Sequence, residues 1–65
     1  MKKYKPGTLV QSKAFLSQDD LIIILGEERN CGWDGMLYSA YNLTDNLFME
    51  RTEKFLDKYY DVVVE

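Results

Sequence analysis

The chain has 65 residues, which leaves room for one hydrophobic core, so residues 1–65 are expected to form a single small domain. Hydrophobic residues make up 46% of the chain and aromatic residues 14%, a composition typical of folded rather than disordered proteins. The net charge of -3 argues against a protein that mainly coats nucleic acid, because phosphate binding needs a concentrated cationic surface.

The first segment contains both residues that break helices. Pro6 and Gly7 exclude a helix near the start, and the β-branched and apolar residues at 8–10 predict a short strand. The polar stretch from Ser12 to Asp20 reads as a loop. Its two apolar residues, Phe15 and Leu16, are expected to fold back over the core.

The run from Leu21 to Leu25 is apolar without alternation and rich in isoleucine. In so short a run this pattern predicts a strand covered on both faces, which makes it the centre of the fold. Acidic pairs stand on either side of the run, at 19–20 and at 27–28. Such charged flanks protect an apolar strand from pairing with other chains.

A concentration of turn-forming residues from Asn30 to Gly35 predicts the turn of a hairpin. The returning strand is expected at Met36 to Tyr41, where its Leu and Tyr side chains would face the apolar run. A second turn is expected at Asn42 to Asn46.

The segment after this second turn has two interpretations. In the first, it forms one helix capped by Asp45, and the fold is a three-stranded antiparallel sheet packed with a C-terminal helix, of the α+β class. In the second, it divides into a strand at Leu47 to Arg51, one helical turn at Glu53 to Lys58 and a last strand at Asp61 to Val64. Residues 38–42 would then pair with residues 47–51, and Val62 to Val64 would close the sheet.

Four segments, KPGTLV, LIIILGEE, MLYSAYN and FLDKYYDVVV, carry a resemblance to a known group of proteins. Together they resemble small, uncharacterised phage-encoded proteins with a Src-homology-3-like β-barrel. The resemblance implies a mainly β fold, a small barrel of about five strands with one short helical turn before the last strand. It therefore favours the second interpretation. It brings no catalytic residues, and it implies a product made in the cytoplasm of an infected bacterium.

The residues for common catalytic or metal sites are missing from the sequence. The chain has no histidine, which removes the commonest general base and the commonest metal ligand, and one cysteine cannot hold zinc. No calcium-loop or phosphate-loop motif is present. We therefore expect no enzyme, no catalytic residue, no metal and no cofactor. Cys31 lacks a histidine partner and is interpreted as a small residue of the turn.

The cysteine count and the length of the apolar runs indicate where in the cell the protein is located. A single cysteine cannot form an intrachain disulfide, which favours a reducing, cytoplasmic setting. The longest apolar run is too short to span a membrane, so no membrane association is expected.

Aromatic residues are the candidates for binding. Trp33 lies at the predicted hairpin tip, where packing over the core is the favoured interpretation and exposure as a binding anchor is the alternative. In the second case Tyr38 and Tyr41 would extend its surface. Tyr59 and Tyr60 cannot both face inward, so one of them should cover the core while the other presents its hydroxyl. The candidate binding residues are Trp33, Tyr38, Tyr41 and Tyr60.

Three functional hypotheses follow. The first is a non-catalytic protein-interaction or structural accessory module with an unidentified protein partner. The alternative is a nucleic-acid-binding barrel whose basic strip would consist of Lys2, Lys3, Lys5 and Lys13, against which the acidic net charge argues. The third is a homo-oligomer in which copies pair through the edge at Val62 to Val64.

Overall fold

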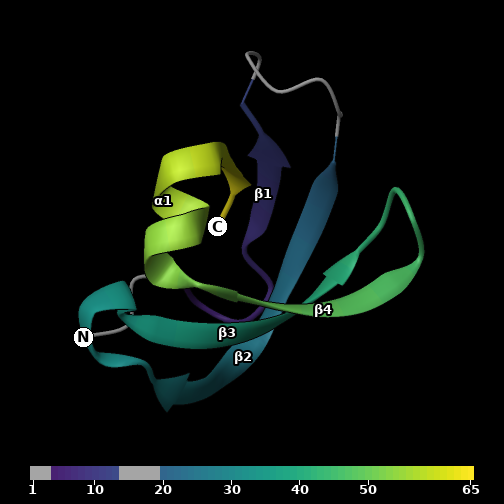
Figure 1. Ribbon diagram of the computed structural model, residues 1–65. Coiled ribbons are helices and arrows are strands. Elements are labelled where there is room, and N and C mark those ends of the chain that lie inside the picture. The colour runs from purple at the N-terminus through teal and green to yellow at the C-terminus, as the bar shows by residue number, and fades with distance from the viewer. Residues whose placement is uncertain (1–3, 14–19) are drawn as a thin grey trace.

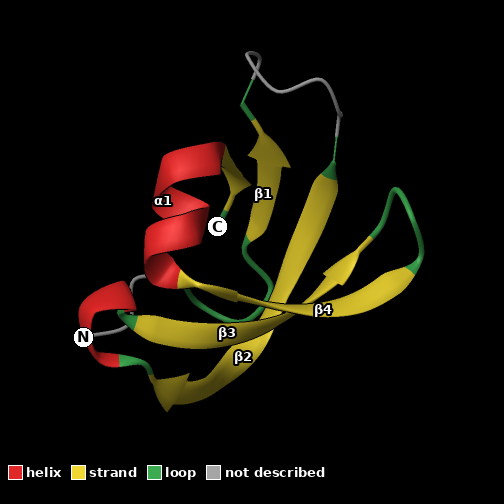
Figure 2. Cartoon of the chain, in the orientation of Figure 1, coloured by secondary structure: helices red, strands yellow, loops and turns green. Residues whose placement is uncertain are grey.

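A computed structural model describes residues 4–13 and 20–65 of the chain. The predictions for Phe15, Leu16, Lys2 and Lys3 lie outside these residues. The elements appear in Figures 1 and 2. In chain order they are β1 (Leu9–Ser12), β2 (Leu21–Asn30), the short 3-10 helix η1 (Gly32–Asp34), β3 (Met36–Asn42), β4 (Leu47–Thr52), α1 (Glu53–Tyr59) and β5 (Tyr60–Val64).

All five strands belong to one antiparallel sheet with the order β4-β3-β2-β1-β5. The prediction of a mainly β fold with a short helix before the last strand is therefore confirmed. The single-helix alternative is wrong, because residues 47–52 pair with β3 over their whole length, from Leu47 opposite Asn42 to Thr52 opposite Leu37.

The sheet is open. β5 pairs with β1, and in the described residues no pairing joins β5 to β4. Val62 to Val64 thus extend the sheet by one strand instead of closing it. The helix α1 connects β4 to β5 and contacts both of these edge strands.

The central hairpin has the predicted turns but a longer first strand. β2 continues past Leu25 to Asn30, and it contains irregularities between Ile24 and Gly26 and between Glu27 and Arg29. Such bulges increase the bend and twist of a strand. They also shift the pairing, so that Tyr41 faces Ile23 as expected, whereas Tyr38 faces Glu27.

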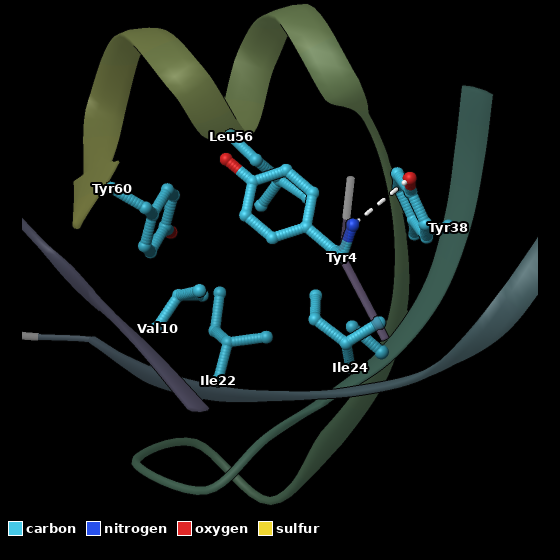
Figure 3. Packing of buried hydrophobic residues seen from close by; sticks show 8 residues of the cluster. Tyr4, Val10, Ile22, Ile24, Tyr38, Leu56 and Tyr60 are labelled. Carbon is cyan, nitrogen blue, oxygen red and sulfur yellow. Dashed lines mark hydrogen bonds between the residues drawn. The ribbon is translucent and has the colours of Figure 1, made fainter. Parts of the chain in front are cut away.

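The core lies between the inner side of the bent sheet and α1 (Figure 3). Leu56 is the buried residue of α1, and it meets side chains contributed by the sheet and by the segment before β1. The buried cluster consists of Tyr4, Val10, Ile22, Ile24, Tyr38, Ala40, Leu56 and Tyr60. Three tyrosines in so small a core mean that their hydroxyl groups need partners.

The expectation that the run from Leu21 to Leu25 is covered on both faces is wrong. Ile22 and Ile24 are fully buried, but Leu21 and Ile23 are only partly buried and Leu25 is 44% exposed. The strand alternates in burial because the sheet is covered by α1 on its inner side alone within the described residues.

Thr52 caps the N-terminus of α1. The Oγ1 atom of Thr52 accepts a hydrogen bond from the backbone N–H of Phe55 at 3.3 Å, and Thr52 itself has extended backbone geometry. The helix ends where Tyr60 returns to extended geometry and starts β5. Of the two neighbouring tyrosines, Tyr60 is buried and Tyr59 is partly exposed, as predicted.

Candidate functional site

The four aromatic residues predicted for binding do not form one exposed patch. Trp33 is exposed, Tyr41 is partly buried, and Tyr38 and Tyr60 belong to the core. The structure thus leaves Trp33 and Tyr41 at the surface, on different elements, η1 and β3.

The side chain of Trp33 is 98% exposed, so the interpretation that it packs over the core is wrong. The reason lies in the turn, which is stabilised by its own hydrogen bonds. Asn30 Oδ1 accepts from the backbone N–H of Gly32 at 2.8 Å, and the N–H of Cys31 donates to the carbonyl of Gly35 at 2.8 Å. Cys31, a partly buried free thiol, is a turn residue as predicted.

Tyr38 is buried because its polar group has a partner inside the fold. The backbone N–H of Tyr4 donates to its hydroxyl at 3.3 Å, and the two rings meet edge to face with centroids 5.4 Å apart (Figure 3). Tyr41 points to the other side of the sheet. Its ring meets Phe48 at 4.8 Å, and its hydroxyl donates to Asn46 Oδ1 at 3.3 Å.

A groove of about 600 Å³ lies along β4, and we call it the β4 groove. Apolar and aromatic side chains of β4, α1 and β5 form most of its wall, and polar groups from the ends of β1, β2 and β3 complete it. It is lined by Ser12, Asp20, Asn42, Asp45, Leu47, Phe48, Met49, Arg51, Phe55, Tyr59 and Tyr60.

The register of β4 explains why side chains of this strand face the groove. Leu47, Met49 and Arg51 pair with Asn42, Ala40 and Tyr38, which are buried on the inner side of the sheet. Because paired residues share a face, these three side chains point inward. No strand among the described residues pairs with the outer edge of β4, and Leu47 is 60% exposed. The inner row of β4 therefore combines two apolar side chains with Arg51, and it is open to solvent at Leu47 while Met49 is partly buried.

One end of the β4 groove carries a row of stacked side chains, which we call the α1 ladder: Arg51, Phe55, Tyr59 and Lys58. The guanidinium carbon of Arg51 lies 5.2 Å from the centre of the Phe55 ring. The Phe55 and Tyr59 rings are 4.8 Å apart, and Lys58 Nζ lies 5.4 Å from the centre of Tyr59. Two aromatic rings are thus held between two cations.

The charges of the β4 groove are separated along its length. Arg51 lies at the α1 end, whereas Asp45 lies in the turn between β3 and β4. Asp20 lies next to Leu21, whose N–H donates to Thr44 Oγ1 of that turn at 3.0 Å, and its own N–H donates to Ser12 Oγ, opposite Tyr60, at 2.9 Å. The groove is therefore acidic at its turn end and basic at its α1 end.

Tyr60 lies on the inner wall between these charges. Burial raises its pKa above the ordinary value, and so does the nearby Asp20, to whose carboxylate the hydroxyl is hydrogen-bonded, while Arg51 acts in the opposite direction. The hydroxyl is therefore neutral at physiological pH and serves as a hydrogen-bonding group within the wall.

The chemistry of the groove follows from the side chains that line it. In residues 4–13 and 20–65 no group of three or more Cys, Asp and Glu side chains is placed to hold a metal ion. No helix in this part of the chain is long and apolar enough to cross a membrane. The groove presents apolar surface, aromatic rings, a guanidinium and carboxylates, which are groups that recognise a partner by contact and charge.

Searches of protein-family models, of curated proteins and of solved structures found no match for this chain.

Sequence reasoning did not find the β4 groove. Its α1 end has a local signal, since Lys54 and Lys58, and Phe55 and Tyr59, are four residues apart and so adjoin on a helix. Arg51 precedes the helix, so the spacing does not indicate its contact with Phe55. The opposite end, with Asp20 and Asp45, is formed by segments distant in sequence and has no such signal.

Proposed function

We propose that this chain is a non-catalytic protein-interaction module that binds its partner in the β4 groove. The observation that carries the proposal is the open groove beside β4, an edge strand whose inward side chains, the exposed Leu47 and the partly buried Met49, line that groove. An edge strand offers free backbone donors and acceptors, and the adjoining groove offers sites for side chains.

We also propose that the scaffold is a small Src-homology-3-like barrel, left open between β4 and β5. Two consecutive hairpins, one short helix and a last strand beside β1 follow the order that the resemblance implies. A phage origin and a cytoplasmic location stay predictions of that resemblance.

The alternative, a nucleic-acid-binding barrel, is less well supported by the charges. Asp20 and Asp45 line the groove, and carboxylates repel a phosphate backbone. Of the basic strip predicted for nucleic acid, Lys13 contacts acidic α1 and β5 residues: Nζ donates to the carbonyl of Asp57 at 3.3 Å and lies 3.9 Å from Asp61 Oδ1.

Site-specific crosslinking tests the proposal. A photoreactive benzoylphenylalanine replaces Leu47 in the groove or, as the control, the exposed Glu28 on β2. After irradiation in the cells that make the protein, we expect one protein to be crosslinked from position 47 and not from position 28. Equal products from both positions, no product, a product of twice the chain's mass, or a nucleic-acid adduct would each contradict the proposal.

A further inference from the structure

The separated charges of the β4 groove indicate what kind of segment binds there. We infer that the ligand is an extended peptide with acidic residues at one end, apolar residues in the middle and basic residues at the other end. This inference rests on the proposed function and specifies the partner's chemistry.

The α1 end selects the acidic part of the peptide. Lys58 is exposed at the end of the α1 ladder, and Lys54 is exposed beside it on the same helix. A second hollow, which shares Phe55 and Tyr59 with the β4 groove, is lined by both lysines together with Asp34. Three cations, Arg51, Lys54 and Lys58, therefore lie around the Phe55 and Tyr59 rings, and Asp34 lines the hollow beside the two lysines. Carboxylate groups of a ligand gain from these cations, while its apolar atoms contact the rings.

Arg51 is the anchor for a carboxylate. One of its N–H groups donates to the carbonyl of Glu50 at 2.7 Å, and the guanidinium packs on Phe55 at the groove wall. A guanidinium has five N–H donors in a planar fork. Packing on the ring fixes this plane, so that remaining donors are oriented for a carboxylate with little loss of side-chain freedom on binding.

The middle of the groove selects apolar residues. Leu47 and Met49 face it from β4, and Arg51 lies four positions after Leu47, so the inner row spans about 13 Å of extended strand. This length matches a few residues of a peptide added to the free edge of β4, with alternate side chains entering the groove.

The turn end rejects acidic residues and attracts basic ones. Asp45 is exposed there, and Asp20 is partly buried beside Tyr60. This arrangement favours a peptide over a single-stranded nucleic acid. A nucleic acid carries a phosphate at every step and would bring negative charge past both aspartates, whereas a peptide can restrict its negative charge to one end.

Binding of synthetic peptides, measured by fluorescence anisotropy, tests the inference. Four peptides share one apolar centre and differ in their flanks. Two are bipolar, one with an acidic N-terminal and a basic C-terminal flank and one with the reverse. The other two are uniform, with both flanks acidic or both basic. We expect one of the two bipolar peptides to bind at least about tenfold more tightly than either uniform peptide, a difference of about 1.4 kcal/mol, and to weaken as salt is added.

Charge-reversal variants locate the two ends. In the double variant Lys54→Glu and Lys58→Glu, binding of the bipolar peptide should fall about tenfold, whereas Arg29→Glu, the same kind of change at an exposed site on β2, should leave it unchanged. Asp45→Lys should improve binding of the uniformly acidic peptide. The matched control, Glu28→Lys, should not.

Three results would overturn the inference: equal binding of uniform and bipolar peptides, equal effects of Arg29→Glu and the double variant, or displacement of every peptide by an oligothymidine at lower concentration. Crosslinking from position 47 distinguishes failure of the bipolar ligand from failure of the proposed function. A protein partner captured there, together with no peptide preference, would contradict the bipolar ligand alone. Absence of both would contradict the proposed function as well.

Discussion

The hydroxyl of Tyr4 donates a hydrogen bond of 2.6 Å to Asp57 Oδ1, across 53 positions of the sequence. Tyr4 precedes the sheet and Asp57 belongs to α1, so this contact joins the first described residue to the helix that covers the core. The ring of Tyr4 is buried against Tyr38, while its hydroxyl reaches the carboxylate at the core's margin. A hydrogen bond to a charged acceptor is stronger than one between neutral groups.

Replacement of Tyr4 by phenylalanine should therefore destabilise the protein while keeping the ring contact. We expect Tyr4→Phe to lower the free energy of unfolding by about 1.5–3 kcal/mol, measured by urea denaturation. The control is Tyr41→Phe, which removes an exposed hydroxyl bonded to Asn46 and should change stability by less than about 0.5 kcal/mol. Equal effects of the two substitutions would contradict the role assigned to the Tyr4 hydroxyl.

The same hydroxyl should make stability depend on alkaline pH. Burial, and then the hydrogen bond and charge of Asp57, raise the pKa of Tyr4 above its ordinary value of about 10. The folded protein holds this proton more tightly than the unfolded chain does. The stability gained from Tyr4 is therefore complete below pH of about 10 and is lost as the pH rises toward the raised pKa. The pKa of Tyr60 is also raised, and its contribution has the same sign.

We expect the free energy of unfolding to fall with rising pH above about 10 and to fall less steeply in Tyr4→Phe. Urea denaturation at a series of pH values on both sides of 10 measures the two slopes. Parallel curves for the two proteins throughout this range would show that the Tyr4 proton is held equally by the folded and unfolded chains, contrary to the structure.

Leu56 is the side chain through which α1 is anchored to the core. It is fully buried, and the substitution Leu56→Ala should lower the free energy of unfolding by about 2–5 kcal/mol. A domain of this size rarely has more than about 3–5 kcal/mol of stability, so the variant should be largely unfolded by circular dichroism. Lys54→Ala, an exposed change on the same helix, should fold normally. A folded Leu56→Ala protein would contradict the packing of α1 on the sheet.

Much of the sheet could be predicted because its signals are local. The turn residues from Asn30 to Gly35 lie between two apolar runs, and both strands form there. Burial was harder to predict, because it depends on distant partners. Tyr38 is buried since the N–H of Tyr4, 34 positions away, reaches its hydroxyl, and no pattern around Tyr38 indicates that partner.

The candidate site also depends on contacts that local sequence patterns do not indicate. The turn residues correctly predict Trp33 at a hairpin tip, but its exposure depends on hydrogen bonds that close the turn without help from the indole. The β4 groove depends on two facts of tertiary structure. One is the register that turns Leu47 and Met49 inward, and the other is the gap between β4 and β5. The register follows from the predicted pairing of residues 38–42 with residues 47–51, whereas the gap depends on how distant segments pack and has no signal in a short window of sequence.

Trp33 is the chain's one tryptophan, so its fluorescence reports on this position alone. Because the side chain is 98% exposed, we expect the emission maximum to lie near that of the unfolded chain and to shift little on denaturation. Trp33→Ala should change the free energy of unfolding by less than about 0.5 kcal/mol. A strong blue shift in the folded protein, or a clear loss of stability in the variant, would indicate that the indole packs against the domain.

Two glycines offer a matched test of the junction between η1 and α1. Gly35 has a φ of 80°, and a Cβ atom there would lie 3.0 Å from the Cβ of Glu53, whereas a Cβ at Gly26 would meet no atom within 4 Å. Gly35→Ala should therefore lower the free energy of unfolding by about 1–3 kcal/mol, from backbone strain and the contact with α1 combined. Gly26→Ala, which lies in β2, should be neutral or slightly stabilising. Equal stabilities of the two variants in urea denaturation would show that η1 does not pack against α1 as described.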